Sequence, residues 1–159
     1  MRRRIRSIPV ADVKQLLVAE PATVREEDPM ELVMSKMLQD PTTRSVYVLD
    51  GERRVVGSIR LSAVVAYIFP YDKFWKSDDY ADFWSVLFRD SASEFMVTDF
   101  RFVYDDTPIA DMVDIVIREG LEELPVVNHD MKILGEVNIM EVIAYFNAHA
   151  EGIDLTAPE

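Results

Sequence analysis

The chain of 159 residues contains one pattern twice, in residues 24–67 and again in residues 103–145. Each copy has a Val, an acidic or Thr residue before Pro, a run with helical spacing, a short apolar strand, a turn, a Gly, a second strand and an Ala-Tyr ending. With a single one-residue gap, the equivalent pairs are Val24 and Val103, Asp28 and Thr107, Pro29 and Pro108, Val46 and Leu124, Val48 and Val126, Gly57 and Gly135, Val64 and Val142, Ala66 and Ala144, and Tyr67 and Tyr145. A supersecondary unit of this size cannot bury its apolar face alone, so the two copies must pack together. We therefore expect the functional site in the cleft between them.

The local pattern predicts a β-α-β-β-α unit in each copy. A residue that can cap, followed by Pro at the first helical position, predicts helix starts at residues 28–29 and 107–108. Asp28 and Glu31 also have the spacing of a capping box. The apolar residues that follow recur at helical spacing, and Gly120 predicts the end of the second helix; they are Met30, Val33, Met34 and Met37, and Ile109, Met112, Val113 and Val116.

The strands are predicted from short β-rich runs bounded by turn residues. The runs are residues 45–49 and 124–127, with turns at 50–51 and 128–130, second strands ending near Arg60 and Asn138, and short leading strands at 22–24 and 101–103. A final helix follows each second strand. The predicted fold class is α/β (α+β).

Composition limits the classes of protein to which the chain can belong. With 49% hydrophobic residues, it has enough apolar residues for one compact module, but hardly for two independent domains. The absence of Cys excludes disulfides and thiolate metal sites and is compatible with a cytoplasmic protein. The longest apolar run, residues 63–69, is far shorter than a membrane span. Residues 90–159 carry 16 acidic and 3 basic side chains, so nucleic acid is a poor partner.

Residues 70–91 between the copies predict an amphipathic connecting helix. Its aromatic and apolar side chains recur with helical spacing; they are Tyr80, Phe83, Trp84, Leu87 and Phe88. This helix could form a lid over the module or its dimer mate, or dock to another protein. Residues 1–9 are expected to form a basic N-terminal tail, and residues 150–159 a C-terminal tail.

The second copy carries the segment Leu124-Pro-Val-Val-Asn128, followed by Gly135-Glu-Val-Asn-Ile-Met-Glu141. At these residues the chain resembles a tandem pair of cystathionine β-synthase (CBS) domains, also called a Bateman module. The resemblance implies one CBS repeat at residues 10–69 and a second at 92–149, packed about a pseudo-twofold axis. It further implies a homodimer and a regulatory rather than catalytic role. The implied ligand is an adenosyl compound of the AMP, ATP or S-adenosylmethionine type.

In this family the last acid of the Gly segment takes the ribose hydroxyls, and an earlier Ser/Thr position contacts phosphate. The resemblance carries these roles to Glu141 and to Asn138, which departs from the hydroxyl pattern. Family clefts are crossed, so these two residues would face the adenine-pocket residues of the first repeat. Those residues are Leu17, Ala22, Thr43, Arg44, Ser45 and Val46, among which Arg44 could meet a phosphate.

A second cleft is expected to be degenerate. Arg60 occupies its phosphate position, and Ala63 stands where the ribose carboxylate is expected. The resemblance sets these two residues against Met96, Arg101, Leu121, Glu122, Glu123 and Leu124. Two carboxylates at the rim disfavour an anionic ligand.

Each of these residues also has an ordinary structural interpretation. An acid such as Glu141 is favoured at a helix start by the helix dipole, and Asn138 can cap the same helix. Arg60 can be a solvated charge at a strand end. No metal site is predicted, because His129 and His149 lack ligand spacing, and no catalytic motif is present.

Two alternatives from other classes stay open. Residues 44–50 resemble the first CBS domain of bacterial magnesium transporters, and an acidic surface can be neutralised by Mg²⁺, so the chain could be a Mg²⁺-responsive switch. It could also be a ligand-free dimerisation or docking module. In each case the effector protein is unknown.

Overall fold

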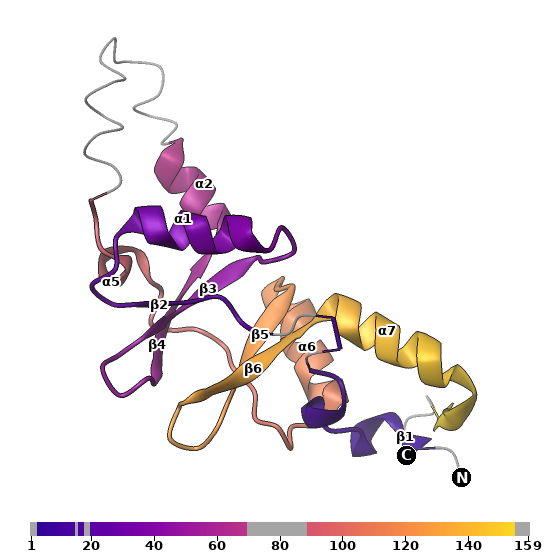
Figure 1. The fold of residues 1–159 in the computed structure, drawn as a ribbon. Coiled ribbons are helices and arrows are strands. Elements are labelled where there is room, and N and C mark those ends of the chain that lie inside the picture. Colours follow the sequence, from indigo (N-terminus) through magenta and orange to yellow (C-terminus); the bar gives the residue numbers. More distant parts are fainter. Residues whose placement is uncertain (1–2, 15, 18–19, 70–88, 155–159) are drawn as a thin grey trace. The chain divides into compact units, whose positions relative to one another are not determined.

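The computed structural model of the protein describes residues 3–14, 16–17, 20–69 and 89–154. The chain divides into two compact units (Figure 1). Unit 1 comprises Met1–Pro21 and Arg101–Glu159, and unit 2 comprises Ala22–Phe100. Each unit contains one of the two repeats. Most of the predicted connecting helix, residues 70–88, lies outside the described residues.

Unit 2 is built on a three-stranded sheet in the order β2-β3-β4. Its elements are β2 (Thr23–Arg25), α1 (Met30–Gln39), β3 (Ser45–Leu49), β4 (Val55–Arg60), α2 (Leu61–Ile68) and the short α5 (Ala92–Phe95). Strand β2 runs parallel to β3, and β3 runs antiparallel to β4. The apolar stripe of α1 packs with the sheet residues in one core, which includes Met30, Val33, Met37, Val46, Val48, Ile59, Val64 and Ala92.

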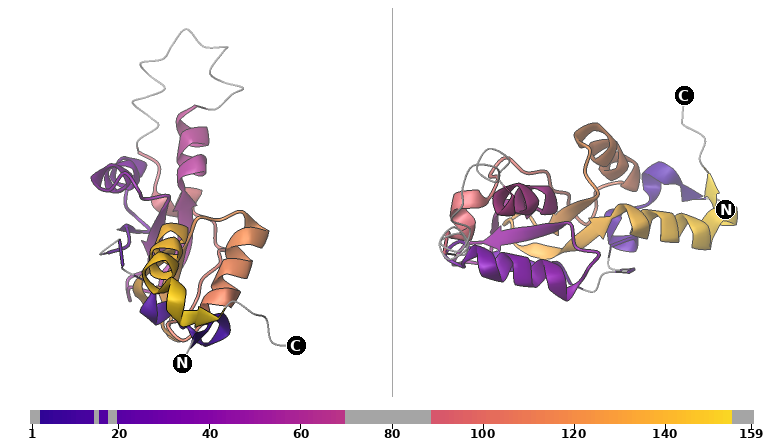
Figure 2. Two further views of the ribbon diagram at one scale, coloured as in Figure 1. Left: turned by 90° about the vertical axis from the view of Figure 1, so that its right-hand side faces the viewer. Right: turned by 90° about the horizontal axis from the view of Figure 1, so that it is seen from above.

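Unit 1 contains the antiparallel pair β5-β6 with the helices α6 and α7. Its elements are β1 (Arg3–Arg4), the 3-10 helices η1 (Ile5–Ser7) and η2 (Val10–Asp12), α6 (Ile109–Glu119), β5 (Glu123–Val127), β6 (Ile133–Asn138), α7 (Ile139–His149), η3 (Ala150–Gly152) and β7 (Ile153–Asp154). Strand β6 leads directly into α7, which Figure 2 shows in yellow. In place of the leading strand expected at 101–103, Val103 forms a single parallel bridge to Val126. Helix α6 ends as expected at Gly120, whose φ of 63° is the left-handed conformation that glycine adopts most easily.

The described residues of the two expected tails are ordered parts of unit 1. Strands β1 and β7 pair in parallel, with Arg3 opposite Ile153 (Figure 2). Ile8 has 0% exposure and belongs to the core of the unit. The prediction that residues 1–9 form a basic tail therefore needs correction. Ile8, which follows the basic start, supplies a side chain to the core of unit 1.

The segment before each repeat packs in the unit of the other repeat. In unit 1, Val10 N donates to Thr107 O (2.8 Å), and Ile109 N donates to Ile8 O (2.8 Å). The equivalent bonds in unit 2 run from Ala92 N to Asp28 O (2.8 Å) and from Met30 N to Asp90 O (2.9 Å). The two leading segments, residues 8–12 and 90–94, thus occupy equivalent places. Each of them precedes one repeat in the sequence but packs with the other repeat in the structure.

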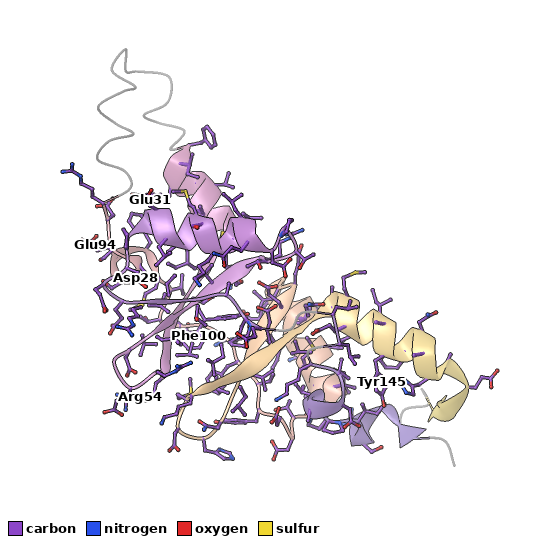
Figure 3. The ribbon with its side chains drawn as sticks, in the orientation of Figure 1. Asp28, Glu31, Arg54, Glu94, Phe100 and Tyr145 are labelled. Atoms are coloured by element: carbon purple, nitrogen blue, oxygen red, sulfur yellow. The ribbon has the colours of Figure 1, made fainter. Side chains whose placement is uncertain are left out.

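The helix starts differ from the expected capping. The N-cap positions of α1 and α6 are Pro29 and Pro108, and no side chain caps either helix. Asp28 Oδ2 accepts a hydrogen bond from Arg25 N (2.7 Å), and Thr107 Oγ1 accepts one from Tyr104 N (2.9 Å). These side chains turn back to the preceding residues, although Asp28 and Glu31 lie at the start of α1 (Figure 3). The predicted caps are therefore wrong, and the side chains tighten the turn instead.

Both β-hairpins have the same turn. Asp50 Oδ1 accepts hydrogen bonds from Glu52 N and Arg54 N, both at 2.9 Å. In the second repeat Asn128 Oδ1 accepts bonds from the N–H groups of Asp130 and Lys132, both at 3.0 Å. The residues just before the returning strands, Arg53 and Met131, have φ of 65° and 61°. A side-chain oxygen at the first turn position thus holds an uncommon backbone conformation in both repeats.

Candidate functional site

The start of α7 in unit 1 is organised around the carboxylate of Glu141, which has 0% exposure. Its Oε2 accepts a hydrogen bond from Asn138 N (3.1 Å), while Asn138 Oδ1 accepts one from Glu141 N (2.9 Å). This reciprocal pair is a capping box. Glu141 Oε1 accepts a third bond from Leu17 N (3.1 Å), across 124 residues of sequence. The acid therefore joins the helix start to the N-terminal segment, and the predicted helix-cap role of Asn138 is confirmed.

Two other predicted residues of unit 1, Glu122 and Glu123, adjoin the same helix start. Ile139 N donates to Glu122 O (3.0 Å), and the buried Glu123 lies opposite Asn138 in the β5-β6 pair. Leu124 is a core residue. Leu121 N instead closes α6 by donating to Val116 O (3.0 Å).

Arg101 has a specific partner, because its Nε lies 3.3 Å from Glu119 Oε1 in an exposed ion pair. Such exposed pairs contribute little to stability. Its predicted place in the second cleft stays a prediction.

In unit 2 the corresponding helix start lacks a buried acid. Arg60 is the N-cap residue of α2 and makes no side-chain cap, and Ala63 occupies the third helical position. Ser45 lies opposite Arg60 in the β3-β4 pair, and Leu61 N donates to Arg44 O (2.8 Å). The two repeats thus place equivalent residues at equivalent points, but only the second repeat has a carboxylate there.

The remaining residues predicted in unit 2 lie in its sheet or in the segments next to it. Arg44 Nη1 donates to Pro41 O (2.8 Å) and Thr43 O (3.2 Å), so this guanidinium helps to hold its own loop. Tyr47 N donates to Ala22 O (2.9 Å), and Val46 is in the core. Met96 packs against the backbone of Gly57. Each predicted cleft combines residues of both units, and its assembly stays a prediction.

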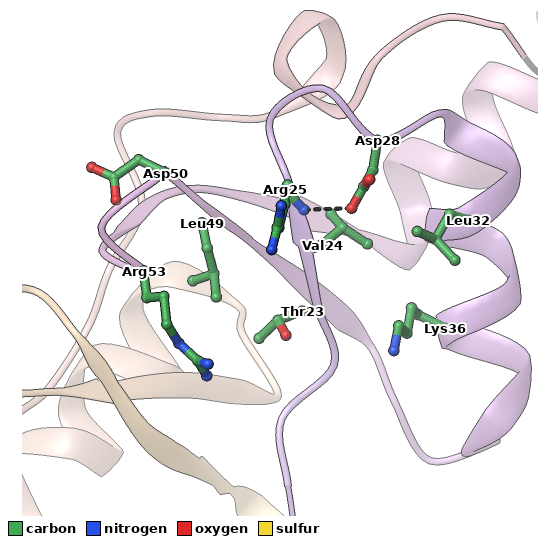
Figure 4. Close-up of a pocket in the computed structure, with 9 residues that line it drawn as sticks. All are labelled: Thr23, Val24, Arg25, Asp28, Leu32, Lys36, Leu49, Asp50 and Arg53. Carbon is green, nitrogen blue, oxygen red and sulfur yellow. Dashed lines mark hydrogen bonds between the residues drawn. The ribbon is translucent and has the colours of Figure 1, made fainter.

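Unit 2 also contains a surface pocket of about 300 Å³ that the sequence reasoning missed (Figure 4). Its polar lining consists of Thr23, Arg25, Asp28, Lys36, Asp50 and Arg53. A signal for it was present in the repeat alignment, because the three basic residues of this lining are Tyr104, Ile115 and Met131 in the second repeat.

A hydrogen bond holds the phenol of Tyr67 at the end of α2. Tyr67 OH donates to Asp90 Oδ2 (2.8 Å), and burial together with this carboxylate raises the pKa of Tyr67 above its usual value. The phenol therefore stays protonated and ties the end of α2 to the segment that leads into α5.

In the described part of the chain, no group of three or more His, Asp or Glu side chains could hold a metal ion. Among the same residues, no helix has the length and apolar character of a membrane span.

Comparison with known proteins identifies the repeats. The sequence matches the CBS domain family at residues 10–70 and 92–148. A CBS domain-containing protein from Thermotoga maritima is 28% identical, with a TM-score of 0.72 over 89% of this chain and 96% of that chain.

Two solved structures at lower identity have the same fold. The CBS domain pair of protein MJ0100, in complex with 5′-methylthioadenosine and S-adenosyl-L-methionine, is 13% identical with a TM-score of 0.68, covering 89% of this chain and 97% of that one. CBSX2 in complex with AMP is 16% identical with a TM-score of 0.70, covering 89% and 98%. With two family matches that span most of its sequence, this chain belongs to the CBS domain family and is a CBS domain pair.

Proposed function

We propose that this CBS domain pair is a regulatory module that binds an adenosyl ligand of the AMP, ATP or S-adenosylmethionine type and has no catalytic activity of its own. Two structures with the same fold were solved with adenosyl compounds, one with AMP and one with S-adenosyl-L-methionine and 5′-methylthioadenosine. The chemistry at the start of one helix, α7, suits the same class of ligand in this chain.

The observation that carries the proposal is the buried carboxylate of Glu141 at the N-terminus of α7. Its oxygens accept backbone N–H groups, Oε1 from Leu17 and Oε2 from Asn138. A ribose offers two neighbouring hydroxyls, and bonds to a charged acceptor are roughly twice as strong as neutral ones. The ribose takes the place of the Leu17 N–H at Oε1, while the bond to Asn138 keeps the carboxylate in position.

This exchange gives the ligand a regulatory effect. When the ribose replaces Leu17 N–H, the segment around Leu17 loses one of its links to α7. A ligand shifts a conformational equilibrium only as far as its affinities for the two states differ. The loss of this link supplies such a difference, and an effector protein that contacts the segment would respond to it.

Isothermal titration calorimetry with AMP, ATP and S-adenosylmethionine tests the proposal, with Glu141→Gln as the test variant. Gln is accepted in a capping box, so the substitution removes the charge and retains the cap at Asn138. Loss of one charge-assisted hydrogen bond costs about 1.5 kcal/mol, or roughly tenfold in affinity. We expect at least one adenosyl compound to bind the wild type and to bind the variant about tenfold more weakly.

Glu94→Gln is the matched control, because Glu94 Oε2 accepts a bond from Ser91 N (2.9 Å) in the capping box of α5. It makes the same chemical change at another helix start and should leave the affinity within about twofold. Thermal denaturation of all three proteins checks that each is folded at the titration temperature. Binding by Glu141→Gln at wild-type affinity would reject the proposed role of Glu141.

Magnesium chloride alone forms a second arm of the titration, because the acidic composition of residues 90–159 keeps a Mg²⁺-responsive switch as the alternative. If Mg²⁺ raises the melting temperature and no adenosyl compound does, this alternative replaces the proposal.

We also propose that the module forms homodimers through the exposed apolar residues of its final helices. Val65 on α2 is 48% exposed, and Ile143, its equivalent on α7, is 55% exposed. Apolar side chains at equivalent positions of both repeats suit a symmetric, self-complementary interface. A Glu at either position would place a charge in that interface.

Sedimentation velocity tests the dimer with Val65→Glu and Ile143→Glu. We expect a dimer for the wild type and a monomer for each variant, with unchanged circular dichroism. Leu38→Glu, at a residue that is 81% exposed on α1, is the control and should stay dimeric. A wild-type protein that sediments as a monomer at all concentrations would contradict the proposal.

A further inference from the structure

The pocket of unit 2 brings together basic side chains from three different elements. Arg25 ends β2, Lys36 lies on α1, and Arg53 lies in the turn between β3 and β4. In Figure 4, Thr23 lies between Arg53 and Lys36, so its hydroxyl and the two cationic groups line one hollow. Val24, Leu32 and Leu49 supply its apolar wall.

The two acidic side chains of the pocket, Asp28 and Asp50, already interact with residues close to them in sequence. Asp28 Oδ2 accepts the hydrogen bond from Arg25 N that Figure 4 marks with a dashed line. Asp50 accepts bonds from its own turn and pairs with Arg54, whose Nε lies 2.8 Å from Asp50 Oδ2. Arg54 is not part of the lining, so it offsets the charge of Asp50 from outside the pocket.

The basic residues of the pocket interact more weakly with their neighbours than the acidic ones do. Within the described ranges, Lys36 and Arg53 form no ion pair with an acidic side chain. Arg25 lies 4.0 Å from Glu27 in a pair whose two side chains are largely exposed, and such pairs contribute little. A pocket with three cations and locally bound acids favours an anion, even in a protein of net charge −12.

The second repeat shows that the fold does not require these cations. The positions equivalent to Arg25, Lys36 and Arg53 carry Tyr104, Ile115 and Met131. The backbone is the same at the turn, where Arg53 and Met131 have φ of 65° and 61°. The three charges are therefore a property of this pocket and not of the repeat.

We propose that this pocket is an anion-binding site for a small phosphoryl compound, held by Arg25, Lys36 and Arg53 with the Thr23 hydroxyl. Guanidinium groups match phosphate oxygens in a two-pronged geometry, and the Lys ammonium acts as a compact charge. The pocket volume of about 300 Å³ is at the lower end for small-molecule sites. This favours a ligand of the size of pyrophosphate, or the diphosphate group of a larger molecule that extends into solvent.

This site uses none of the residues assigned to the adenosyl clefts, so its test is independent of the proposed function. Isothermal titration calorimetry with inorganic phosphate and with sodium pyrophosphate, at ionic strength held constant with chloride, measures the binding. The test variant is the double substitution Lys36→Ile and Arg53→Met, which introduces the residues that the second repeat carries at the same positions. The matched control is Arg118→Met with Lys132→Met, which removes two charges from exposed positions of unit 1.

We expect pyrophosphate to bind the wild type more tightly than phosphate, because it can contact more of the three cations. Each lost charge-assisted contact weakens binding by about tenfold, so the test variant should bind at least about tenfold more weakly. The control should stay within about twofold, and all three proteins should have the same circular dichroism spectrum.

The proposal is overturned if pyrophosphate gives no binding heat with the wild type at about 10 mM, a concentration at which even millimolar sites fill. It is also overturned if the control loses as much affinity as the test variant, because the binding would then follow net charge alone. A nucleoside diphosphate forms a final arm: a loss of its affinity in Lys36→Ile/Arg53→Met identifies the diphosphate of a larger molecule as a ligand of the pocket. Unchanged affinity for both diphosphates in that variant would reject the site.

Discussion

At the scale of single residues, glycine is required where the backbone of β4 is approached closely. A Cβ added to Gly57 would lie 2.5 Å from Met96 Sδ and 2.7 Å from Met96 Cβ. The approach is fixed by the adjacent Ser58, which exchanges hydrogen bonds of 3.1 and 2.9 Å with Val97. Residue 57 therefore has no room for a side chain unless Met96 moves.

We predict that Gly57→Ala lowers the free energy of unfolding by about 1–3 kcal/mol, the usual cost of overpacking. Gly51→Ala is the control, since a Cβ there meets no atom within 4 Å. Urea denaturation followed by circular dichroism measures both. Equal midpoints for the two variants would show that Met96 makes room without cost.

How far single residues could be predicted depends on the distance in sequence to their partners. Gly120 was predicted as a helix stop because its conformation is set by the helix that it ends. Asn138 and Glu141, three residues apart, had the spacing of a cap. The contact of Glu141 with Leu17 spans 124 residues, and no local pattern contains it. The resemblance to CBS domains did set Leu17 opposite Glu141, but it did not predict the backbone hydrogen bond that joins them.

At the scale of elements, the two hairpin turns differ in one property that can be measured. Asp50 can be protonated and Asn128 cannot, although both accept two backbone hydrogen bonds. The pKa of Asp50 lies below its usual value, chiefly because its side chain accepts the N–H of Arg54. A carboxyl group with a lowered pKa stabilises the fold above its unfolded pKa of about 4, and this contribution is lost as the pH falls through the folded value.

We therefore predict that Asp50→Asn loses less stability than the wild type between pH 6 and pH 3. The converse change, Asn128→Asp, should lose more, because it introduces the same acid into the second turn. Melting temperatures across this pH range test both predictions. Three parallel pH profiles would mean that neither turn depends on the charge.

The elements also show why a correct pattern gave a wrong cap. The acidic or Thr residue before Pro did mark the start of each helix, within a residue or two. However, Asp28 and Thr107 both face the preceding segment, where Arg25 and Tyr104 offer backbone donors. Spacing alone could not distinguish an oxygen that caps the following helix from one that closes the preceding turn.

At the scale of the whole molecule, the two compact units do not coincide with the two sequence repeats. The predicted repeats, 10–69 and 92–149, agree with the family matches at 10–70 and 92–148, but in the structure residues 3–14 pack with the second repeat and residues 89–100 with the first. Each leading segment is short, and its apolar residues do not show which repeat they join. The pocket of unit 2 was missed for a similar reason, because three elements must fold together before Arg25, Lys36 and Arg53 approach one another.

The exchanged segment makes Ile8 a core residue of unit 1, and this yields the last prediction. Ile8 has 0% exposure, lies in one cluster with Val10, Val13 and Ile109, and accepts the backbone bond from Ile109 N (2.8 Å). Replacing a buried Ile by Ala removes apolar contacts and leaves a cavity, at a cost of about 2–5 kcal/mol. Ile8→Ala should therefore destabilise the protein by that amount in urea denaturation, whereas Leu38→Ala, at a largely exposed residue, should change it by less than about 0.5 kcal/mol. Hydrogen exchange locates the effect: the amides of β5 and α6 should lose protection in Ile8→Ala. A variant with wild-type stability would mean that Ile8 behaves as part of the tail that the sequence suggested for residues 1–9, and the exchange of segments would have to be abandoned.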